Sequence, residues 1–145
     1  MARVKKILIV RDFMSIDPPT VAPNDCLQKV VELLRRRDIR SVAVLEDGKL
    51  VGIVTDCDVR QVAPGYPLLH DEDEIRRYRE NLRVTAALTA DPMTIAPNTP
   101  LVEAAKILET YRIGSLPVVD GTKLVGMLTA DDLLRAFVKQ NQQAA

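Results

Sequence analysis

The feature that most constrains this chain is an internal repeat with a period of 74 residues, the interval from Val21 to Ile95. A shift of this length places the segment Val21-Ala22-Pro23-Asn24 on Ile95-Ala96-Pro97-Asn98, and no gap is needed afterwards. It also superposes Leu50-Val51-Gly52 on Leu124-Val125-Gly126. Such self-similarity means that one structural unit has been used twice. A unit of about 60 residues is marginal alone, so we expect the two to bury a face against each other.

Within the first repeat, the pattern predicts a short extended piece followed by a helix. Thr20-Val21 is the extended piece, and Pro23 closes it. The segment Asp25-Cys26-Leu27-Gln28 resembles a capping box at the start of a helix, which is expected to end near Asp38. The apolar residues of this helix recur at helical spacing, which predicts one buried face: Leu27, Val30, Val31 and Leu34.

A hairpin and a second helix complete the first repeat. Residues 41–45 have the composition of a strand, and Asp47-Gly48 is a turn signal that leads into a second strand at residues 49–54. Thr55 then stands at the expected start of a helix. This helix is expected to stop before Pro64-Gly65.

The second repeat predicts the same order of elements. Thr94-Ile95 is the extended piece, and Thr99-Pro100 opens a helix, because proline suits a first helical turn. The remaining segments are a hairpin at residues 116–119 and 123–128, a final helix from Asp131 through Phe137, and a frayed polar tail at residues 139–145.

Between the repeats, an acidic run precedes apolar residues at helical spacing. Asp71-Glu72-Asp73-Glu74 comes first, Ile75, Tyr78 and Leu82 follow, and arginines lie further along. Acids at the start of a helix and bases toward its end suit the helix dipole. Two interpretations stay open: a solvent-exposed linker helix with one apolar edge, or a lid or partner contact formed by residues 66–78.

The composition excludes several classes of protein. Hydrophobic residues make up 47% of the 145 residues, which is ample for a core, and 20 basic residues balance 20 acidic ones. This balance gives no electrostatic footprint for nucleic acid. The apolar run at residues 7–10 is too short for a signal peptide, and no stretch approaches a membrane span. We therefore expect a cytoplasmic protein without a nucleic-acid or membrane partner.

The sequence predicts neither a metal site nor an active site. Cys26 and Cys57 form neither a disulfide framework nor a Cys-x-x-Cys site, and His70 is the only histidine. Glycine-rich phosphate loops of the Gly-x-Gly-x-x-Gly or Gly-x-x-x-x-Gly-Lys type do not occur. We expect no catalytic residues, no metal and no required cofactor.

The element Thr-x-x-Asp occurs at the same place in both repeats. The two copies are Thr55 with Asp58 and Thr129 with Asp132. In each copy, the threonine directly follows a glycine and two apolar residues. A strand that feeds a helix in this way presents unpaired N–H groups and a hydroxyl together, which favours an anion. Because the same element is also an ordinary helix cap, both interpretations stay open.

Taken together, these features resemble a tandem pair of CBS domains, a Bateman module. The resemblance rests on the order of elements, on residues 113–120 and 126–132, and covers roughly residues 10–137. Residues 11–14 and 133–137 most resemble stand-alone proteins of the acetoin-utilisation AcuB type. The implied fold is α/β (α+β), with two β-α-β-β-α repeats packed with pseudo-twofold symmetry. The expected boundaries are repeat 1 at 10–63, a linker with a short helix at 64–83, and repeat 2 at 84–138.

The resemblance also implies adenosine-binding sites in clefts between the repeats. In the family, the Asp of Thr-x-x-Asp holds the ribose diol, while the Thr and adjacent amides face phosphate. Carried over, these roles fall to Asp58 with Thr55 and to Asp132 with Thr129. The other residues that the resemblance implies in nucleotide binding are Pro19, Thr20, Ile39, Arg40, Ser41, Val42, Ala43, Met93, Thr94, Ile113, Gly114, Ser115, Leu116 and Pro117.

Departures from the family pattern make the two implied sites unequal. Many relatives carry Arg where this chain has Cys57, so a triphosphate is held less well there. Asp131 occupies the same position in the second repeat, where its charge would repel phosphate. Arg40 of the first repeat stands where the second repeat has Gly114. It either supplies the cation that is missing at Cys57 or is simply a surface arginine. AMP, ADP or S-adenosylmethionine therefore fits better than ATP.

The resulting hypothesis is a regulatory binding module rather than an enzyme. It senses AMP, ADP, ATP or S-adenosylmethionine and modulates an unidentified effector protein through a change of shape or affinity. The module is expected to be a homodimer. The alternative is a structural or adaptor homodimer whose clefts bind nothing.

Overall fold

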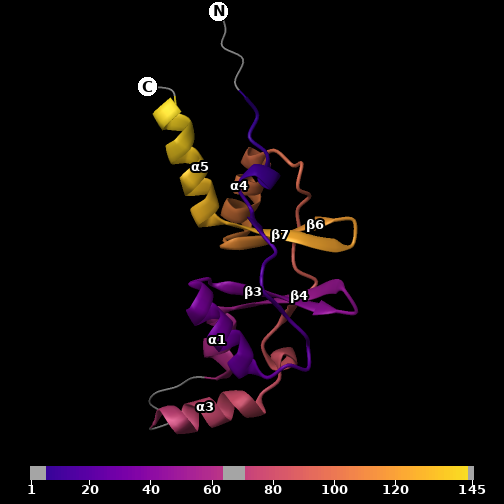
Figure 1. Ribbon diagram of the computed structural model, residues 1–145, viewed down its shortest axis with the longest axis vertical. Coiled ribbons are helices and arrows are strands. Elements are labelled where there is room, and N and C mark those ends of the chain that lie inside the picture. Colours follow the sequence, from indigo (N-terminus) through magenta and orange to yellow (C-terminus); the bar gives the residue numbers. More distant parts are fainter. Residues whose placement is uncertain (1–5, 64–70, 144–145) are drawn as a thin grey trace, which may run out of the picture. The chain divides into compact units, whose positions relative to one another are not determined.

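The computed structural model describes residues 6–63 and 71–143 (Figure 1). It divides into two compact units, each of which has its own sheet. The first-repeat unit comprises Pro18–Pro92, and the second-repeat unit comprises Met93–Ala145 with Met1–Asp17. Helices and strands alternate in both units, so the mixed α/β fold expected from the repeat is confirmed.

The first-repeat unit is a sheet covered by helices. Its elements are β2 (Thr20–Val21), α1 (Leu27–Arg37), β3 (Ser41–Glu46), β4 (Lys49–Thr55), α2 (Asp56–Val62), α3 (Glu72–Asn81), the 3-10 helix η2 (Val84–Ala86) and β5 (Thr89–Ala90). The strand order is β2-β3-β4-β5, with β2 parallel to β3 and the other pairs antiparallel. Helix α1 lies on one face of the β3–β4 hairpin, and α3 lies beyond α1 (Figure 1).

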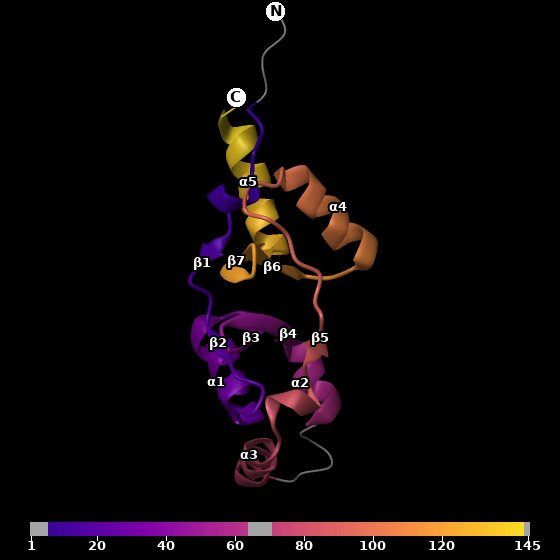
Figure 2. The same ribbon diagram turned by 90° about the vertical axis from the view of Figure 1, so that its right-hand side faces the viewer.

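The second-repeat unit follows the same plan. Its elements are the 3-10 helix η1 (Val10–Asp12), β1 (Ser15–Ile16), α4 (Leu101–Tyr111), β6 (Ser115–Asp120), β7 (Lys123–Thr129) and α5 (Ala130–Gln143). The strand order is β1-β7-β6, and both pairs are antiparallel. Ile95 adds an isolated parallel bridge to Val118, in the place that β2 holds in the first unit. Helices α4 and α5 lie on one face of this sheet (Figures 1 and 2).

The first hairpin forms where its turn signal predicts it, and the second forms at the expected strands. In the first, Ser41 lies opposite Thr55 and Glu46 lies opposite Lys49. Asp47 and Gly48 connect the strands with φ angles of 51° and 76°, and consecutive positive φ angles match the right-handed twist of a hairpin. The hairpin expected from residues 41–54 is therefore confirmed.

Each unit buries a separate aliphatic core between its sheet and its helices. The first core contains Val21, Leu27, Val30, Val31, Val42, Val44, Val54, Val59, Ala63 and Val84. The second contains Val10, Ile95, Leu101, Ala104, Leu108, Leu116, Val118, Leu128 and Ala136. Leu27, Val30 and Val31 of the predicted helical face are buried as expected, while Leu34, the fourth predicted member, is partly buried against the same core.

The compact units and the sequence repeats differ at their N-terminal segments. The segment that contains η1 and β1 precedes the first repeat, but Val10 is fully buried in the core of the second-repeat unit and β1 pairs with β7. Conversely, Val84 of η2 is fully buried in the first core, and β5 pairs with β4. Asp17 and Asp91, each followed by proline, have positive φ angles where the chain passes between the units.

Two equivalent glycines make room for these exchanged strands. A Cβ atom at Gly52 would lie 2.9 Å from the carbonyl oxygen of Thr89. A Cβ atom at Gly126 would lie 2.8 Å from the carbonyl oxygen of Ser15. Both distances are shorter than normal van der Waals contact, so the glycine of each Leu-Val-Gly segment is required by close approach of backbone.

The start of α1 differs from the prediction. The N-cap is Cys26, without a side-chain hydrogen bond, so the capping box expected from Asp25 and Gln28 is wrong. Asp25 instead closes the preceding turn: its Oδ2 accepts from the Ala22 N–H at 2.8 Å and lies 3.0 Å from Lys29 Nζ. The hydrogen bond from Ala22, and then that from Lys29, holds the pKa of Asp25 below its ordinary value of 3.8.

The C-terminal end and the linker complete the comparison with the predictions. Helix α5 continues to Gln143, so the frayed tail expected from residue 139 onward is wrong for residues 139–143. Helix α3 forms as expected, begins at the N-cap Asp71, and buries none of its residues. Residues 66–70 of the alternative lid, His70 among them, lie outside the described residues.

Candidate functional site

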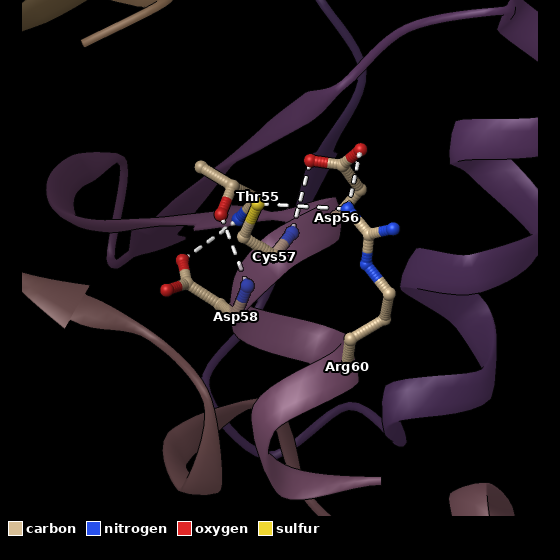
Figure 3. Close-up of polar contacts among 5 residues, drawn as sticks. All are labelled: Thr55, Asp56, Cys57, Asp58 and Arg60. Carbon is tan, nitrogen blue, oxygen red and sulfur yellow. Dashed lines mark hydrogen bonds and ion pairs between the residues drawn. The ribbon is translucent and has the colours of Figure 1, made fainter. Parts of the chain in front are cut away.

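The first Thr-x-x-Asp element forms a reciprocal cap at the start of α2 (Figure 3). Thr55 Oγ1 accepts from the Asp58 N–H at 3.1 Å, and Asp58 Oδ2 accepts from the Thr55 N–H at 2.9 Å. Both residues are partly buried. The cap fixes the position of the carboxylate at the end of β4, and Asp58 Oδ1 takes no part in it.

Arg60 lies beside this cap and was not singled out by the sequence. Its Nη2 atom is 3.5 Å from Asp56 Oδ2 and 3.5 Å from Cys57 Sγ (Figure 3). Because 72% of its side chain is exposed, the guanidinium keeps access to solvent. It therefore supplies a cation next to Cys57. The i,i+4 spacing of Asp56 and Arg60 was a signal that could have identified it.

The second Thr-x-x-Asp element forms the same pair of hydrogen bonds at the start of α5. Asp132 Oδ2 accepts from the Thr129 N–H at 2.8 Å, and Thr129 Oγ1 accepts from the Asp132 N–H at 3.3 Å. Asp132 is only 2% exposed, and its Oδ1 lies 3.2 Å from Arg135 Nη1. The position equivalent to Arg135 in the first repeat is Gln61. The second carboxylate is therefore paired with a cation that the first lacks.

Strand pairing brings the other predicted residues of the first repeat to the same end of the sheet. Thr20 pairs with Ala43, and Ser41 pairs with Thr55. The carbonyl oxygen of Arg40 accepts from the Asp56 N–H at 3.0 Å, which joins the start of β3 to the start of α2. These contacts place the candidate binding residues of the first repeat within the first-repeat unit.

The second set is brought together in the same way. Ser115 pairs with Thr129, and the Gly114 carbonyl oxygen accepts from the Ala130 N–H at 3.0 Å. The Ile95 N–H donates to the Pro117 carbonyl oxygen at 3.1 Å, which brings the exposed Met93-Thr94 segment toward Pro117.

Burial separates the candidate wall residues into two groups. The side chains of Val42 and Leu116 are fully buried within the cores, so only their backbone can face a ligand. Ile39 and Ile113 pack against the edges of the same cores and stay partly exposed. Pro19 and Thr20, which are also candidate binding residues, are partly exposed, so their side chains can contact a ligand.

The charges around the two carboxylates differ. In the first repeat, Arg40 is exposed and Cys57 is neutral. In the second repeat, Gly114 carries no side chain, and a Cβ atom placed there would meet no atom within 4 Å. The exposed Asp131 adds negative charge. The exposed groups next to the two carboxylates therefore differ, with the neutral Cys57 beside Asp58 and the acidic Asp131 beside Asp132.

The described residues offer neither a metal site nor a membrane-spanning helix. No group of three or more His, Cys, Asp or Glu residues within residues 6–63 and 71–143 could hold a metal ion. No helix in those ranges is both long and apolar enough to cross a bilayer.

Comparison with known proteins gives a consistent result. The chain is 34% identical over 135 residues to a CBS domain-containing protein of Dictyostelium discoideum, a match that covers 91% of this chain and 92% of that one. An inosine-5'-monophosphate dehydrogenase of Korarchaeum cryptofilum is 33% identical, but the match spans only 24% of that enzyme.

Solved structures match over nearly the whole chain. A putative acetoin utilization protein (AcuB) from Vibrio cholerae has a TM-score of 0.78 at 25% identity, with 97% of this chain and 98% of that chain covered. CBSX2 of Arabidopsis thaliana in complex with AMP has a TM-score of 0.76 at 26% identity, with 90% and 97% covered. The family model for the CBS domain matches twice, at residues 10–65 and 84–139. The chain therefore belongs to the CBS domain family and carries two CBS domains in tandem.

Proposed function

We propose that this CBS domain pair binds an adenosine-containing ligand and reports its concentration to a partner protein. The observation that carries the proposal is the repeated arrangement at Asp58 and Asp132, where a capped carboxylate stands beside a serine-bearing strand end. The similarity to CBSX2, which is described in complex with AMP, supports the ligand class.

The first carboxylate has the chemistry to hold a ribose. Asp58 Oδ2 is occupied by the cap, whereas Oδ1 lies outside the cap and can accept from a ribose hydroxyl. A hydrogen bond to a charged acceptor contributes about 1.5–3 kcal/mol. The cap holds the carboxylate in place before the ligand arrives, so little side-chain entropy is lost on binding.

The cations of the first repeat favour a ligand with a short phosphate chain. Arg40 is exposed and its carbonyl oxygen accepts from the Asp56 N–H at the start of α2, while the exposed Arg60 contacts Asp56 and Cys57 on the side of α2 away from the Asp58 carboxylate (Figure 3). AMP or ADP matches this modest positive charge, while ATP would place more negative charge near the carboxylates of Asp56 and Asp58. S-adenosylmethionine, whose sulfonium is positive, suits the more acidic surroundings of Asp132.

Regulation would follow from a difference in affinity between two conformations. A ligand that binds one conformation more tightly shifts the population toward it, and a partner protein that prefers the same conformation reads the shift. The proposed working form is a homodimer, and the effector protein is a separate chain. The ligand is a regulator, so the proposal requires no cofactor and no catalytic residue.

Calorimetric titration of the full chain with AMP, ADP, ATP and S-adenosylmethionine tests the proposal. We expect binding of at least one of the four, and we expect Asp58→Ala and Asp132→Ala each to weaken its own site by about tenfold to a hundredfold. Glu46→Gln, an exposed acid at the far end of β3, is the matched control and should bind normally. Unchanged affinity in both aspartate variants would overturn the ribose assignment.

An adaptor whose sites bind nothing is the second candidate function. It is favoured by one observation: the carboxylate of Asp132 is satisfied within the protein, by the cap and by Arg135. Absence of binding by all four ligands below about millimolar concentration would support this alternative.

A further inference from the structure

Helix α3 lies between the two repeats in sequence and packs against α1 (Figures 1 and 2). It buries none of its residues. Its salt bridge to α1 is long, with Arg76 Nη2 at 3.9 Å from Glu32 Oε1. Arg76 Nε lies closer to Glu80 Oε1 of α3 itself, at 3.0 Å. Because exposed ion pairs contribute little, α3 is held to α1 by weak polar contacts.

The buried polar atoms without a partner lie on the same two helices. Within residues 6–63 and 71–143, two buried side-chain atoms lack a hydrogen-bond partner: Gln28 Oε1 of α1 and Arg79 Nε of α3. The start of α1 adjoins the end of α3, because the Leu27 N–H donates to the Leu82 carbonyl oxygen at 2.8 Å. Buried polar groups are normally paired. The contact between these helices, the α1–α3 junction, therefore has capacity for a further polar partner.

Two guanidinium groups come together at the α1–α3 junction. Arg35 is exposed on α1, and Arg79 is partly buried on α3. Burial, and then the charge of Arg35, lowers the pKa of Arg79. The salt bridges among the described residues include neither arginine. Repulsion between the two cations therefore opposes the docking of α3 on α1.

The carboxylates at the junction are already paired. Glu32 and Glu80 both lie beside Arg76. Residues 64–70, which connect α2 to α3 in the sequence, contain no Asp or Glu. The position equivalent to Arg35 in the second repeat is Glu109, so this arginine is particular to the first repeat. We therefore expect the counter-charge for Arg35 and Arg79 to come from another molecule.

We propose that the α1–α3 junction binds a phosphate group through Arg35 and Arg79. A phosphate dianion matches two guanidinium charges, whereas a carboxylate matches one. Arginine holds phosphate with two parallel hydrogen bonds, and one of them can come from Nε. The phosphate is either a free anion or a phosphoryl group on another molecule. The proposal does not rest on the adenosine sites, because no residue of the Thr-x-x-Asp elements takes part in it.

A phosphate bound in this way would fasten α3 to α1. It replaces the repulsion between Arg35 and Arg79 with attraction of both to one anion. Opening of α3 would then require release of the anion, so opening becomes rarer as the phosphate concentration rises. Amide hydrogen exchange of α3 reports this opening directly.

Hydrogen exchange of the full chain in phosphate and in chloride of matched ionic strength tests the site. We expect the α3 amides to exchange about fivefold more slowly in about 10 mM inorganic phosphate than in chloride. O-phosphoserine at the same concentration distinguishes the two sources. Slowing by O-phosphoserine supports a phosphoryl group on another molecule, and slowing by inorganic phosphate alone supports the free anion.

Substitution of each arginine assigns the effect to the junction. Arg35→Gln and Arg79→Gln should each reduce the phosphate response of α3 to less than about 1.5-fold. In chloride, Arg35→Gln should leave exchange of α3 unchanged or slower, because it removes the repulsion of Arg79. A merely structural role of Arg35 predicts faster exchange instead. Arg36→Gln is the matched control, since it removes the same charge from an exposed neighbour and should keep the full response.

Thermal unfolding of each variant establishes that it is folded. Equal exchange of α3 in phosphate and chloride would overturn the site, and would mean that water satisfies Arg79. A full response in both Arg35→Gln and Arg79→Gln would place the phosphate elsewhere. Loss of the response in Arg36→Gln as well would reduce the effect to general screening of positive charge, which also overturns the proposal.

Discussion

Asp132 Oδ1 lies 3.2 Å from Arg135 Nη1, whereas Asp58 has Gln61 at the position equivalent to that arginine. A ribose that binds Asp132 must therefore compete with a guanidinium. We expect Arg135→Gln to strengthen binding of an adenosine ligand at the second carboxylate by up to about fivefold, the equivalent of a surface ion pair of up to about 1 kcal/mol.

Calorimetry in an Asp58→Ala background reads the second site alone. In that background, Arg135→Gln should lower the dissociation constant of the ligand. A weaker complex after Arg135→Gln would mean that Arg135 contacts the ligand and does not compete with it. Gln61→Ala in an Asp132→Ala background is the matched control and should leave affinity at the first site unchanged.

The capping and ligand-binding roles of Asp58 are separable by substitution. Asp58→Asn keeps an oxygen that can accept from the Thr55 N–H, while Asp58→Ala removes the acceptor altogether. Loss of this one hydrogen bond costs about 0.5–1.5 kcal/mol, since Thr55 Oγ1 still accepts from the backbone N–H of residue 58. We therefore expect Asp58→Ala to lower the free energy of unfolding by this amount, and Asp58→Asn to lower it less, in urea denaturation.

Ligand affinity should respond differently to the same two variants. Because asparagine is neutral, Asp58→Asn should lose most of the affinity that Asp58→Ala loses. If Asp58→Asn binds AMP like the wild type, the carboxylate serves only as a helix cap.

Local features of the site and the fold were predictable from the sequence. The cap joins Thr55 and Asp58, three positions apart, and the turn at Asp47-Gly48 uses positive φ angles that Asp and Gly adopt readily, so neither depends on distant parts of the chain. Equivalent spacing of Thr129 and Asp132 in the second repeat strengthened the prediction of the cap.

Features that depend on distant segments or on side-chain rotamers were not predictable in this way. Strand β1 pairs with β7 and strand β5 pairs with β4, so each adds to the sheet of the other repeat. Both β1 and β5 have only two residues, which is too short for a recognisable periodicity. Asp25 was assigned to a capping box because its spacing to Gln28 fits one, but the Ala22 N–H and Lys29 Nζ compete for its carboxylate. The ion pair of Asp132 with Arg135 depends on the rotamer of a long side chain.

The close contact between Gly126 and Ser15 predicts a stability effect. Gly126→Ala would push a Cβ atom against the Ser15 carbonyl oxygen and Met14, so β1 must move away from β7. Overpacking of this kind costs about 1–3 kcal/mol. We expect the free energy of unfolding, measured in urea, to fall by that amount.

Gly114→Ala is the matched control for the glycine prediction. A Cβ atom at Gly114 meets nothing within 4 Å, so this variant should unfold at the wild-type urea concentration or slightly above it. Equal destabilisation by the two alanines would show that close approach of β1 is not what requires Gly126.

Asp25 predicts a pH dependence of stability whose sign follows from its lowered pKa. The hydrogen bonds from Ala22 and Lys29 favour the charged carboxylate in the folded state, so the folded pKa lies below the ordinary value of 3.8. The stabilisation is therefore present above pH 3.8 and is lost as the pH falls below that value through the folded pKa.

At pH 7, Asp25→Asn should lower the free energy of unfolding by about 1 kcal/mol. Urea denaturation of both proteins from pH 7 downward should show this difference shrinking at acid pH, while Glu46→Gln, at the exposed end of β3, shows none. A difference that stays constant to the lowest pH would mean that Asp25 acts through its shape and not through its charge.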